Sequence, residues 1–231
     1  GHSKPPRDII DQMRALLALT LFFMPLTATA EEAADASGPA VSLTELAAAA
    51  DLVALVQARD MDYFMRRDIP VSGSAFLKIL IPYKMDQEID LVEVYEKGLH
   101  ENECYFPNPT VFEEGRRYLL FVKRDPEDPE RYRGLPQGCA LEALVMADNR
   151  YAVRWPLAGF RLSDPVEELV TEMTFADGYA VVNDEALAPA ERNAMLEAGQ
   201  IVSAGEDSWR FTRGIDLSAL RRLIDPEALQ P

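Results

Sequence analysis

Short runs of β-type sequence constrain the fold of this chain more than any other feature. Each run is apolar or alternates apolar with polar residues, and turn-forming residues bound it. The runs are 52–59, 74–81, 90–96, 117–123, 139–146 and 151–155. No segment between them has the length and period of a helix that could join parallel neighbours, so the sheet should be antiparallel. Strands this apolar would expose adhesive edges in an open sheet, which favours a small closed barrel or a sandwich.

Helical patterns flank these runs. Ser42 and Glu45 have the spacing of a capping box, followed by strong helix formers up to residue 50. Beyond residue 160 we predict three more helices and a small hairpin. The helices are 163–173, 189–198 and 216–224, and the hairpin joins 201–203 to 209–211. We therefore expect a flexible lead-in over 31–41, a barrel over 42–160 and a helical C-terminal extension over 161–231 that packs on the barrel.

The N-terminal region has the pattern of a cleavable signal peptide. Residues 1–12 precede the first methionine and are set aside as an upstream remnant. Residues 13–30 combine one arginine, an apolar run too short to span a bilayer comfortably, and the small residues Ala28-Thr29-Ala30. Cleavage would leave Glu31 at the new terminus, and an uncleaved membrane anchor is the alternative. We predict a periplasmic or secreted protein, with a bacterial envelope favoured because no usable glycosylation acceptor is present.

The acidic composition restricts the partners. The chain of 231 residues has a formal net charge of −16. Residues 1–30 hold three of its basic and two of its acidic side chains, so their removal takes away +1 and leaves −17. Such a charge repels phosphate backbones and anionic lipid headgroups. We expect neither nucleic acid nor a membrane span after cleavage, and basic partners or cations suit the chain better.

Two cysteines, Cys104 and Cys139, lie in the mature part of the chain. An exported protein with an even number of cysteines usually oxidises them, so a disulfide is predicted. Two buried free thiols are the alternative. A redox-active pair is disfavoured because the two residues are far apart in sequence and no C-x-x-C motif exists.

Part of the chain resembles the netrin-like and TIMP-like modules. The resemblance covers about residues 50–154 and rests on the segments ADLVALVQA, CYFPNP, FEEGRRYLLFVK and GLPQGCALEAL. Its most specific element contains Gly115, Tyr118 and Leu119-Leu120-Phe121, with a cysteine on each side. The resemblance implies a mainly β protein: a five-stranded antiparallel OB-like barrel with a helical C-terminal extension, and a role in binding. TIMP-like inhibitors chelate zinc through an N-terminal cysteine, which this chain lacks, so their inhibitory mechanism does not carry over.

Candidate binding residues are aromatic side chains at strand ends or in loops of the barrel, namely Tyr105, Phe106 and Trp155, with packing beneath the loops as the alternative. His100 is the one imidazole of the mature chain, and the acidic run 125–130 lacks the order of a calcium loop. We therefore expect no catalytic residue, resident metal or cofactor. The predicted function is a non-catalytic extracytoplasmic module that engages a protein or glycan through barrel loops; the alternative is an envelope hydrolase or metal-dependent enzyme that uses carboxylates.

Overall fold

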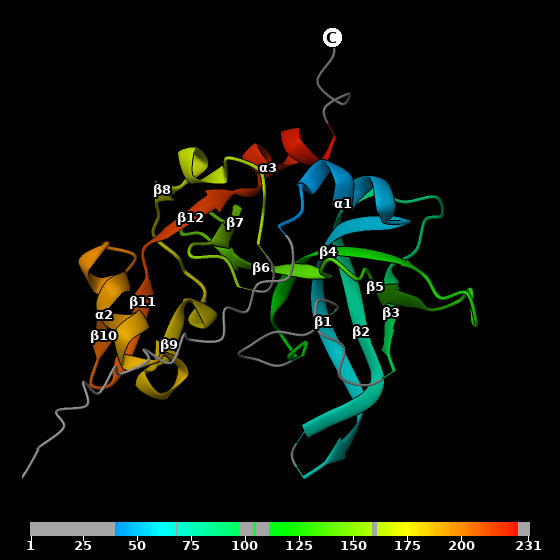
Figure 1. Cartoon of the computed structure of the whole chain (residues 1–231), viewed down its shortest axis with the longest axis horizontal. Helices are drawn as coiled ribbons and strands as arrows, with labels where there is room; N and C mark the ends of the chain where they lie inside the picture. The colour runs from blue at the N-terminus through cyan, green and yellow to red at the C-terminus, as the bar shows by residue number, and fades with distance from the viewer. Residues whose placement is uncertain (1–39, 68, 98–103, 105–110, 159–160, 226–231) are drawn as a thin grey trace, which may run out of the picture. The chain divides into compact units, whose positions relative to one another are not determined.

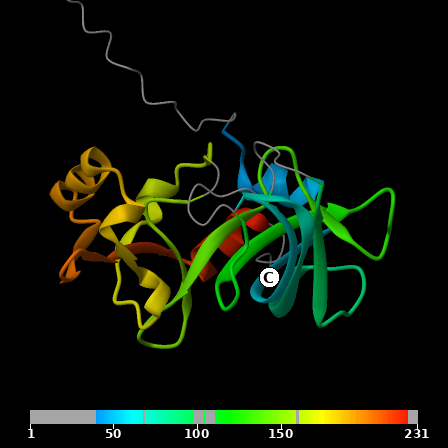
Figure 2. The ribbon, with the colours of Figure 1, turned by 90° about the horizontal axis from the view of Figure 1, so that it is seen from below.

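The structure is a computed structural model, and the residues that it describes are 40–67, 69–97, 104, 111–158 and 161–225. Its centre is a closed five-stranded barrel (Figure 1). The strands are β1 (Leu52–Arg66), β2 (Ile69–Lys84), β3 (Leu91–Glu96), β4 (Arg117–Arg124) and β5 (Tyr132–Gly134). They follow the order β1-β2-β3-β5-β4, and β4 pairs back with β1 to close the ring (Figure 2). The predicted mainly β fold with an OB-like barrel is confirmed.

The barrel is mixed and not antiparallel throughout, which corrects the prediction. β3 and β5 run parallel where Val94 pairs with Tyr132, and every other neighbouring pair in the ring is antiparallel. The reason is geometric. A closed ring with an odd number of strands cannot alternate in direction all the way round, so closing five strands requires one parallel pair.

β1 runs through the middle of the interior, which explains its unbroken apolar sequence. Val53 and Leu55 point into one hydrophobic cluster, whereas Leu52, Ala54 and Val56 point into another on the opposite side of the strand. All five are fully buried. A strand covered on both faces has no reason to alternate between polar and apolar residues.

The sheet continues beyond β4 through strands that the barrel does not contain. They are β6 (Ala140–Val145), β7 (Tyr151–Arg154), β12 (Arg213–Asp216) and β8 (Thr171–Glu172), in that order. The helix predicted over 163–173 is wrong: the segment forms a 3-10 turn η1 (Val166–Leu169) and then β8. Val166 and Met173 are buried, as expected from their apolar side chains. Pairing of β8 with β12 outweighs the helix propensity of the segment.

A smaller sheet lies in the C-terminal part of the chain. It has the order β10-β11-β9, formed by β10 (Ile201–Gly205), β11 (Ser208–Phe211) and β9 (Val181–Asn183). The predicted hairpin therefore exists, joined by a third strand that the sequence pattern did not reveal. The helix α2 (Pro189–Glu197) and two 3-10 turns, η2 (Gly178–Ala180) and η3 (Asp184–Ala186), accompany it. The predicted helical extension thus contains strands as well as helices.

Two short helices, α1 (Leu43–Ala49) and α3 (Leu217–Ile224), cover the first cluster, which lies on the side of β1 and β4 away from the barrel interior. The predicted capping box begins α1, since the Ser42 hydroxyl accepts from the backbone of Glu45 and the Glu45 carboxylate accepts from that of Ser42. The two helices are neighbours, and the Thr44 hydroxyl donates to the Leu223 carbonyl at 2.6 Å. Asp216 caps α3 by accepting from the Ser218 backbone N–H.

The predicted disulfide is present. Cys104 and Cys139 are bonded, with their Cα atoms 4.7 Å apart, and both side chains lie in the second cluster of the interior. The bond ties the β3–β4 connection to the residue before β6. Disulfides are typical of oxidising, extracytoplasmic compartments. The predicted signal peptide (13–30) lies outside the described residues, as does the predicted lead-in (31–41) up to residue 39. No described helix has the length and apolar character to cross a membrane.

Candidate functional site

The aromatic residues predicted as binding candidates do not form one site in the described structure. Tyr105 and Phe106 lie outside the described residues, as does His100. Trp155 follows β7, is half-buried and packs against the hydrophobic cluster that α1 and α3 cover, while its backbone N–H donates to the Arg213 carbonyl at 2.9 Å. Trp155 therefore contributes to packing, which was the alternative to a binding role.

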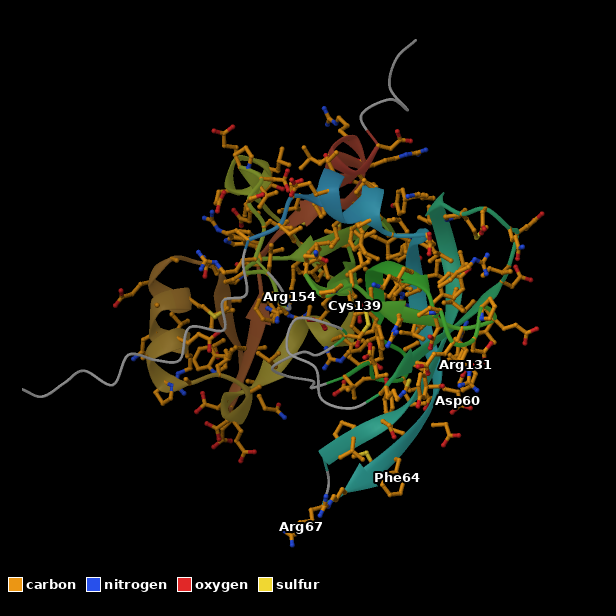
Figure 3. The ribbon with its side chains drawn as sticks, turned by 45° about the vertical axis from the view of Figure 1, so that its right-hand side comes forward. Asp60, Phe64, Arg67, Arg131, Cys139 and Arg154 are labelled. Atoms are coloured by element: carbon orange, nitrogen blue, oxygen red, sulfur yellow. A yellow bond between two sulfur atoms is a disulfide. The ribbon has the colours of Figure 1, made fainter. Side chains whose placement is uncertain are left out.

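Among the described residues, the most exposed large apolar side chain belongs to a β-ribbon that was not predicted from the sequence. β1 pairs with β4 only over Leu52–Gln57, and β2 pairs with β3 only over Gly73–Lys78. Beyond these limits, over 64–66 of β1 and 69–72 of β2, the two strands pair with each other alone. Figures 1 and 3 show this ribbon extending away from the barrel, with Phe64 and Arg67 near its end. We call residues 64–67 the ribbon tip.

Local sequence explains why the two strands stay together beyond the barrel. Gly73 has φ of 138°, and a Cβ atom there would lie 2.2 Å from the Asp62 carbonyl oxygen, so the close approach of the strands requires glycine. Arg67 has φ of 51° at the turn between Arg66 and Ile69. Bulges between Ala58 and Asp60, and at the Phe64–Met65 step, interrupt the register. Such bulges bend a strand pair away from its sheet.

The ribbon tip combines exposed apolar and basic side chains. Phe64 is 67% exposed and Met65 is 51% exposed, and the neighbouring Arg66 and Arg67 are exposed too. Neither arginine forms an ion pair with a described residue. The chain has a net charge of −16, so a tip with two arginines beside a phenylalanine differs in charge from the chain as a whole. Large apolar side chains held out in solvent mark interaction sites more often than not when they cluster.

The outer face of β2 and β3 continues from the ribbon. Phe76 pairs with Glu93 across the two strands and with Asp60 of β1. The Glu93 carboxylate accepts from the Ser74 hydroxyl at 2.6 Å and pairs with Arg131 at 3.1 Å. Arg131 also lies over the Tyr95 ring, 5.2 Å from its centroid. This face offers half-exposed aromatic rings next to charges, a combination suited to polar ligands.

A cavity of about 410 Å³ lies between the β2–β3 and β4–β5 connections. Arg124 and Tyr132 form part of its wall, together with Gln87 and Glu130. Arg124 already makes two hydrogen bonds to the Asp86 carboxylate, at 2.9 and 3.0 Å, and lies over the Tyr132 ring. Burial raises the pKa of Tyr132. The Arg124 guanidinium in the wall of this cavity is thus already bound by groups of the protein itself.

A buried carboxylate joins the barrel to its extension. Glu142 of β6 has 6% of its side chain exposed and is bound by Arg116 and by the Arg154 guanidinium, whose Nε atom lies 2.6 Å from Oε2. Arg116 is also paired with Glu113 and lies over the Tyr179 ring. Buried carboxylates and arginines of this kind hold each other in place, so we assign the cluster a structural role.

The described residues were also examined for groups that could bind a metal ion. There, no group of three or more histidine, cysteine or acidic side chains is arranged to hold a metal ion. No protein-family model, curated protein or solved structure shows significant similarity to this chain. The main features of the candidate site are the ribbon tip and the adjoining β2–β3 face.

Proposed function

We propose that this protein is a non-catalytic binding module that works outside the cytoplasm, in a bacterial periplasm or as a secreted protein, and engages a protein partner through the barrel loops. The observation that carries the proposal is the exposure of Phe64 and Met65 at the ribbon tip. The connection between the first two strands is one of the places where OB-type barrels bind ligands. The resemblance of residues 50–154 to netrin-like modules supports the same role.

A protein surface suits the tip better than a glycan does. Phe64 and Met65 gain free energy by leaving water for an apolar pocket, at about 25 cal/mol per Å² of apolar surface buried. Exposed aromatic and arginine side chains are also the residues that dominate binding energy at protein interfaces. A glycan is the second candidate, favoured by the stacked arrangement of Tyr95, Arg131 and Glu93 on the β2–β3 face.

Extracytoplasmic location rests on two features of the chain. The first is the signal-peptide pattern of residues 13–30, and the second is the Cys104–Cys139 disulfide. Intact mass of the natively expressed protein tests the first of them. A mature species that begins at Glu31 agrees with the proposal, whereas one that keeps Met13 at its terminus contradicts export by cleavage.

The ribbon tip is tested by photo-crosslinking in cells. A photoreactive phenylalanine analogue in place of Phe64 should give a discrete crosslinked protein adduct, and the same analogue in place of exposed Ala48 of α1 should not. The double variant Phe64→Ser/Met65→Ser should retain at least tenfold less of the crosslinked partner protein than wild type does, because both apolar contacts are lost. The melting temperature of this variant should equal that of wild type, since surface substitutions rarely alter stability.

If wild type and the Phe64→Ser/Met65→Ser variant retained equal amounts of the partner protein, the partner would bind at a surface other than the ribbon tip. Capture lost through Phe76→Ser/Tyr95→Ser, but retained by the tip variant, would favour the β2–β3 face and the glycan candidate. A screen of immobilised glycans with wild-type protein then separates the two partner classes.

A further inference from the structure

The cavity between the β2–β3 and β4–β5 connections has an apolar wall. Its apolar lining residues are Ile89, Leu91, Pro129 and Tyr132. Leu91 is 51% exposed, so this part of the wall is open to solvent. The volume of about 410 Å³ is within the range of ligand pockets, which is roughly 300–1,000 Å³. A side chain of a partner protein or a small molecule would fit inside and would cover Leu91.

The carboxylates around this cavity outnumber the cation in its wall. Arg124 is the one cation among the lining residues, and Asp86 binds its guanidinium. Glu130 also lines the cavity, and the Asp51 carboxylate accepts from the Arg124 backbone N–H at 2.8 Å. Neither Glu130 nor Asp51 forms an ion pair with a described residue. Two negative charges therefore remain beside the cavity once Arg124 and Asp86 have compensated each other.

The β2–β3 and β4–β5 connections add further acidic residues. Residues 85–90 contain three acidic and no basic side chains, and residues 125–131 contain four acidic side chains and one arginine. Three cations close to these acids are already bound, in the ion pairs Arg131–Asp128, Lys97–Glu127 and Arg133–Asp125. The surroundings of the cavity therefore keep a negative charge.

The other described lysines compensate little of this charge, and none of them lines the cavity. Lys84 is held elsewhere, because its Nζ atom donates to three carbonyl groups at the C-terminal end of α1. Lys123 precedes Arg124 in β4 and so points to the opposite face of that strand. Lys78 is exposed and lies opposite Leu91 in the β2–β3 pairing, which leaves it as the one described lysine beside the cavity without an ion pair to a described residue.

The carboxylates without an ion pair to a described residue are more numerous than that, namely Asp51, Glu88, Asp90 and Glu130. Their excess over Lys78 attracts a cation to the cavity. A metal ion does not suit the site, since within the described part of the chain no group of three or more acidic, histidine or cysteine side chains is arranged to hold one. The apolar wall favours a cation that carries an aliphatic chain.

We propose that this cavity receives a lysine or arginine side chain from a basic segment of a partner protein. Such side chains have an aliphatic stem and a charged head, so the stem can cover Leu91 while the head approaches Glu130. Glu88 and Asp90 belong to the same rim but not to the lining, and further basic residues of the segment can reach them. A segment therefore uses more of this charge than a single small amine does, and the net charge of −16 assists its approach. The proposal does not depend on what the ribbon tip binds.

NMR titration of the isotope-labelled full chain with an acetylated and amidated tetralysine peptide tests this site. In about 0.15 M salt the Debye length is roughly 8 Å, which suppresses attraction by the distant charges of the chain. The backbone amide signals of 86–91 and 130–132 should shift and saturate, and those of α2 should not. A tetraglutamine peptide should shift neither group. The single amine n-butylammonium should bind the same residues about tenfold more weakly, because it reaches one carboxylate at a time.

Substitutions at the rim and in the wall separate the cavity from the net charge. Glu88→Gln/Glu130→Gln should weaken binding of the tetralysine peptide about fivefold, because two carboxylates are neutralised. Glu191→Gln/Glu206→Gln is the matched control, since it changes the net charge equally at exposed residues of α2 and the β10–β11 hairpin. Leu91→Gln should weaken binding about threefold through loss of the apolar contact. Leu196→Gln, at a residue of α2 that is 36% exposed, should not.

Circular dichroism melts show whether these variants keep their fold, and Leu91→Thr replaces Leu91→Gln if that variant does not. Signal shifts spread over acidic residues of the whole chain overturn the proposal. Equal weakening by the two double variants overturns it too, because the attraction would then come from net charge alone. Unchanged affinity of the Leu91 variant overturns the apolar contact, and equal affinity for n-butylammonium overturns the choice of a basic segment as the occupant.

Discussion

A chain that stops after Asp216 is expected to lose about 5–9 kcal/mol of its free energy of unfolding. The truncation removes α3, whose Leu217, Leu220 and Ile224 side chains are at most 7% exposed and belong to the interior cluster shared with β1. Each fully buried aliphatic side chain contributes roughly 1.5–3 kcal/mol, so three of them account for the range. Domains are stable by only about 5–15 kcal/mol, so the truncated chain should be largely unfolded at room temperature or close to it.

Urea unfolding followed by far-ultraviolet circular dichroism measures this loss. A chain that ends at Asp225 separates the contribution of residues 226–231 from that of α3. Leu220→Ala alone should cost about 2–5 kcal/mol. Arg222→Ala on the exposed side of the same helix should cost little. If the chain that stops after Asp216 had the same urea midpoint as the full chain, α3 would be an appendage and not part of the protein core.

The barrel was predictable because its strands carry local signals. The unbroken apolar run from residue 52 and the alternation in β2 and β3 follow directly from burial on two faces or on one. The capping box of α1 and the apolar stripe of α3 are also local. The disulfide followed from cysteine number and the predicted compartment. The parallel β3–β5 contact was missed because β5 has three residues, too few to show a period.

The ribbon was not predictable for the opposite reason. Over residues 59–66 only Met61 and Tyr63 are half-buried, against the second cluster, and the other six residues are exposed. This alternation is too short to have extended the predicted strand beyond residue 59. Backbone pairing with β2 keeps this part of β1 in place, and the close approach at Gly73 that it requires cannot be recognised from the neighbouring sequence. Phe64 and Met65 were therefore not among the predicted binding residues.

The burial of Glu142 could not be predicted from its neighbours in the sequence. It lies within the apolar run of β6, and its partners are Arg116, just before β4, and Arg154 at the end of β7. When the strand is considered alone, one acidic residue among apolar ones resembles the exposed position of an alternating pattern. The tertiary structure instead buries it, because two arginines from neighbouring segments reach the same carboxylate. Burial of an acid can be recognised only when its cationic partners are known.

Replacing Glu142 with glutamine should lower the free energy of unfolding by about 3–5 kcal/mol. The substitution keeps the shape of the side chain but leaves the guanidinium groups of Arg116 and Arg154, which are 17% and 15% exposed, facing a neutral amide. Arg154 also lies over the Phe211 ring of the C-terminal sheet, 4.4 Å from its centroid. The loss should therefore loosen the junction between the barrel and that sheet as well as the cluster itself.

A double-mutant cycle separates the pair from its surroundings. Arg154→Met alone removes one cation, and Glu142→Gln/Arg154→Met should cost less than the sum of the two single changes, because the second substitution removes a charge that the first left unpaired. Asp148→Asn is the control for a carboxylate paired with arginine at the surface, through Arg150 at 2.8 Å, and should leave the urea midpoint unchanged. Additive costs for Glu142→Gln and Arg154→Met would show that the two side chains act independently, and the carboxylate would then stabilise the junction through Arg116 alone.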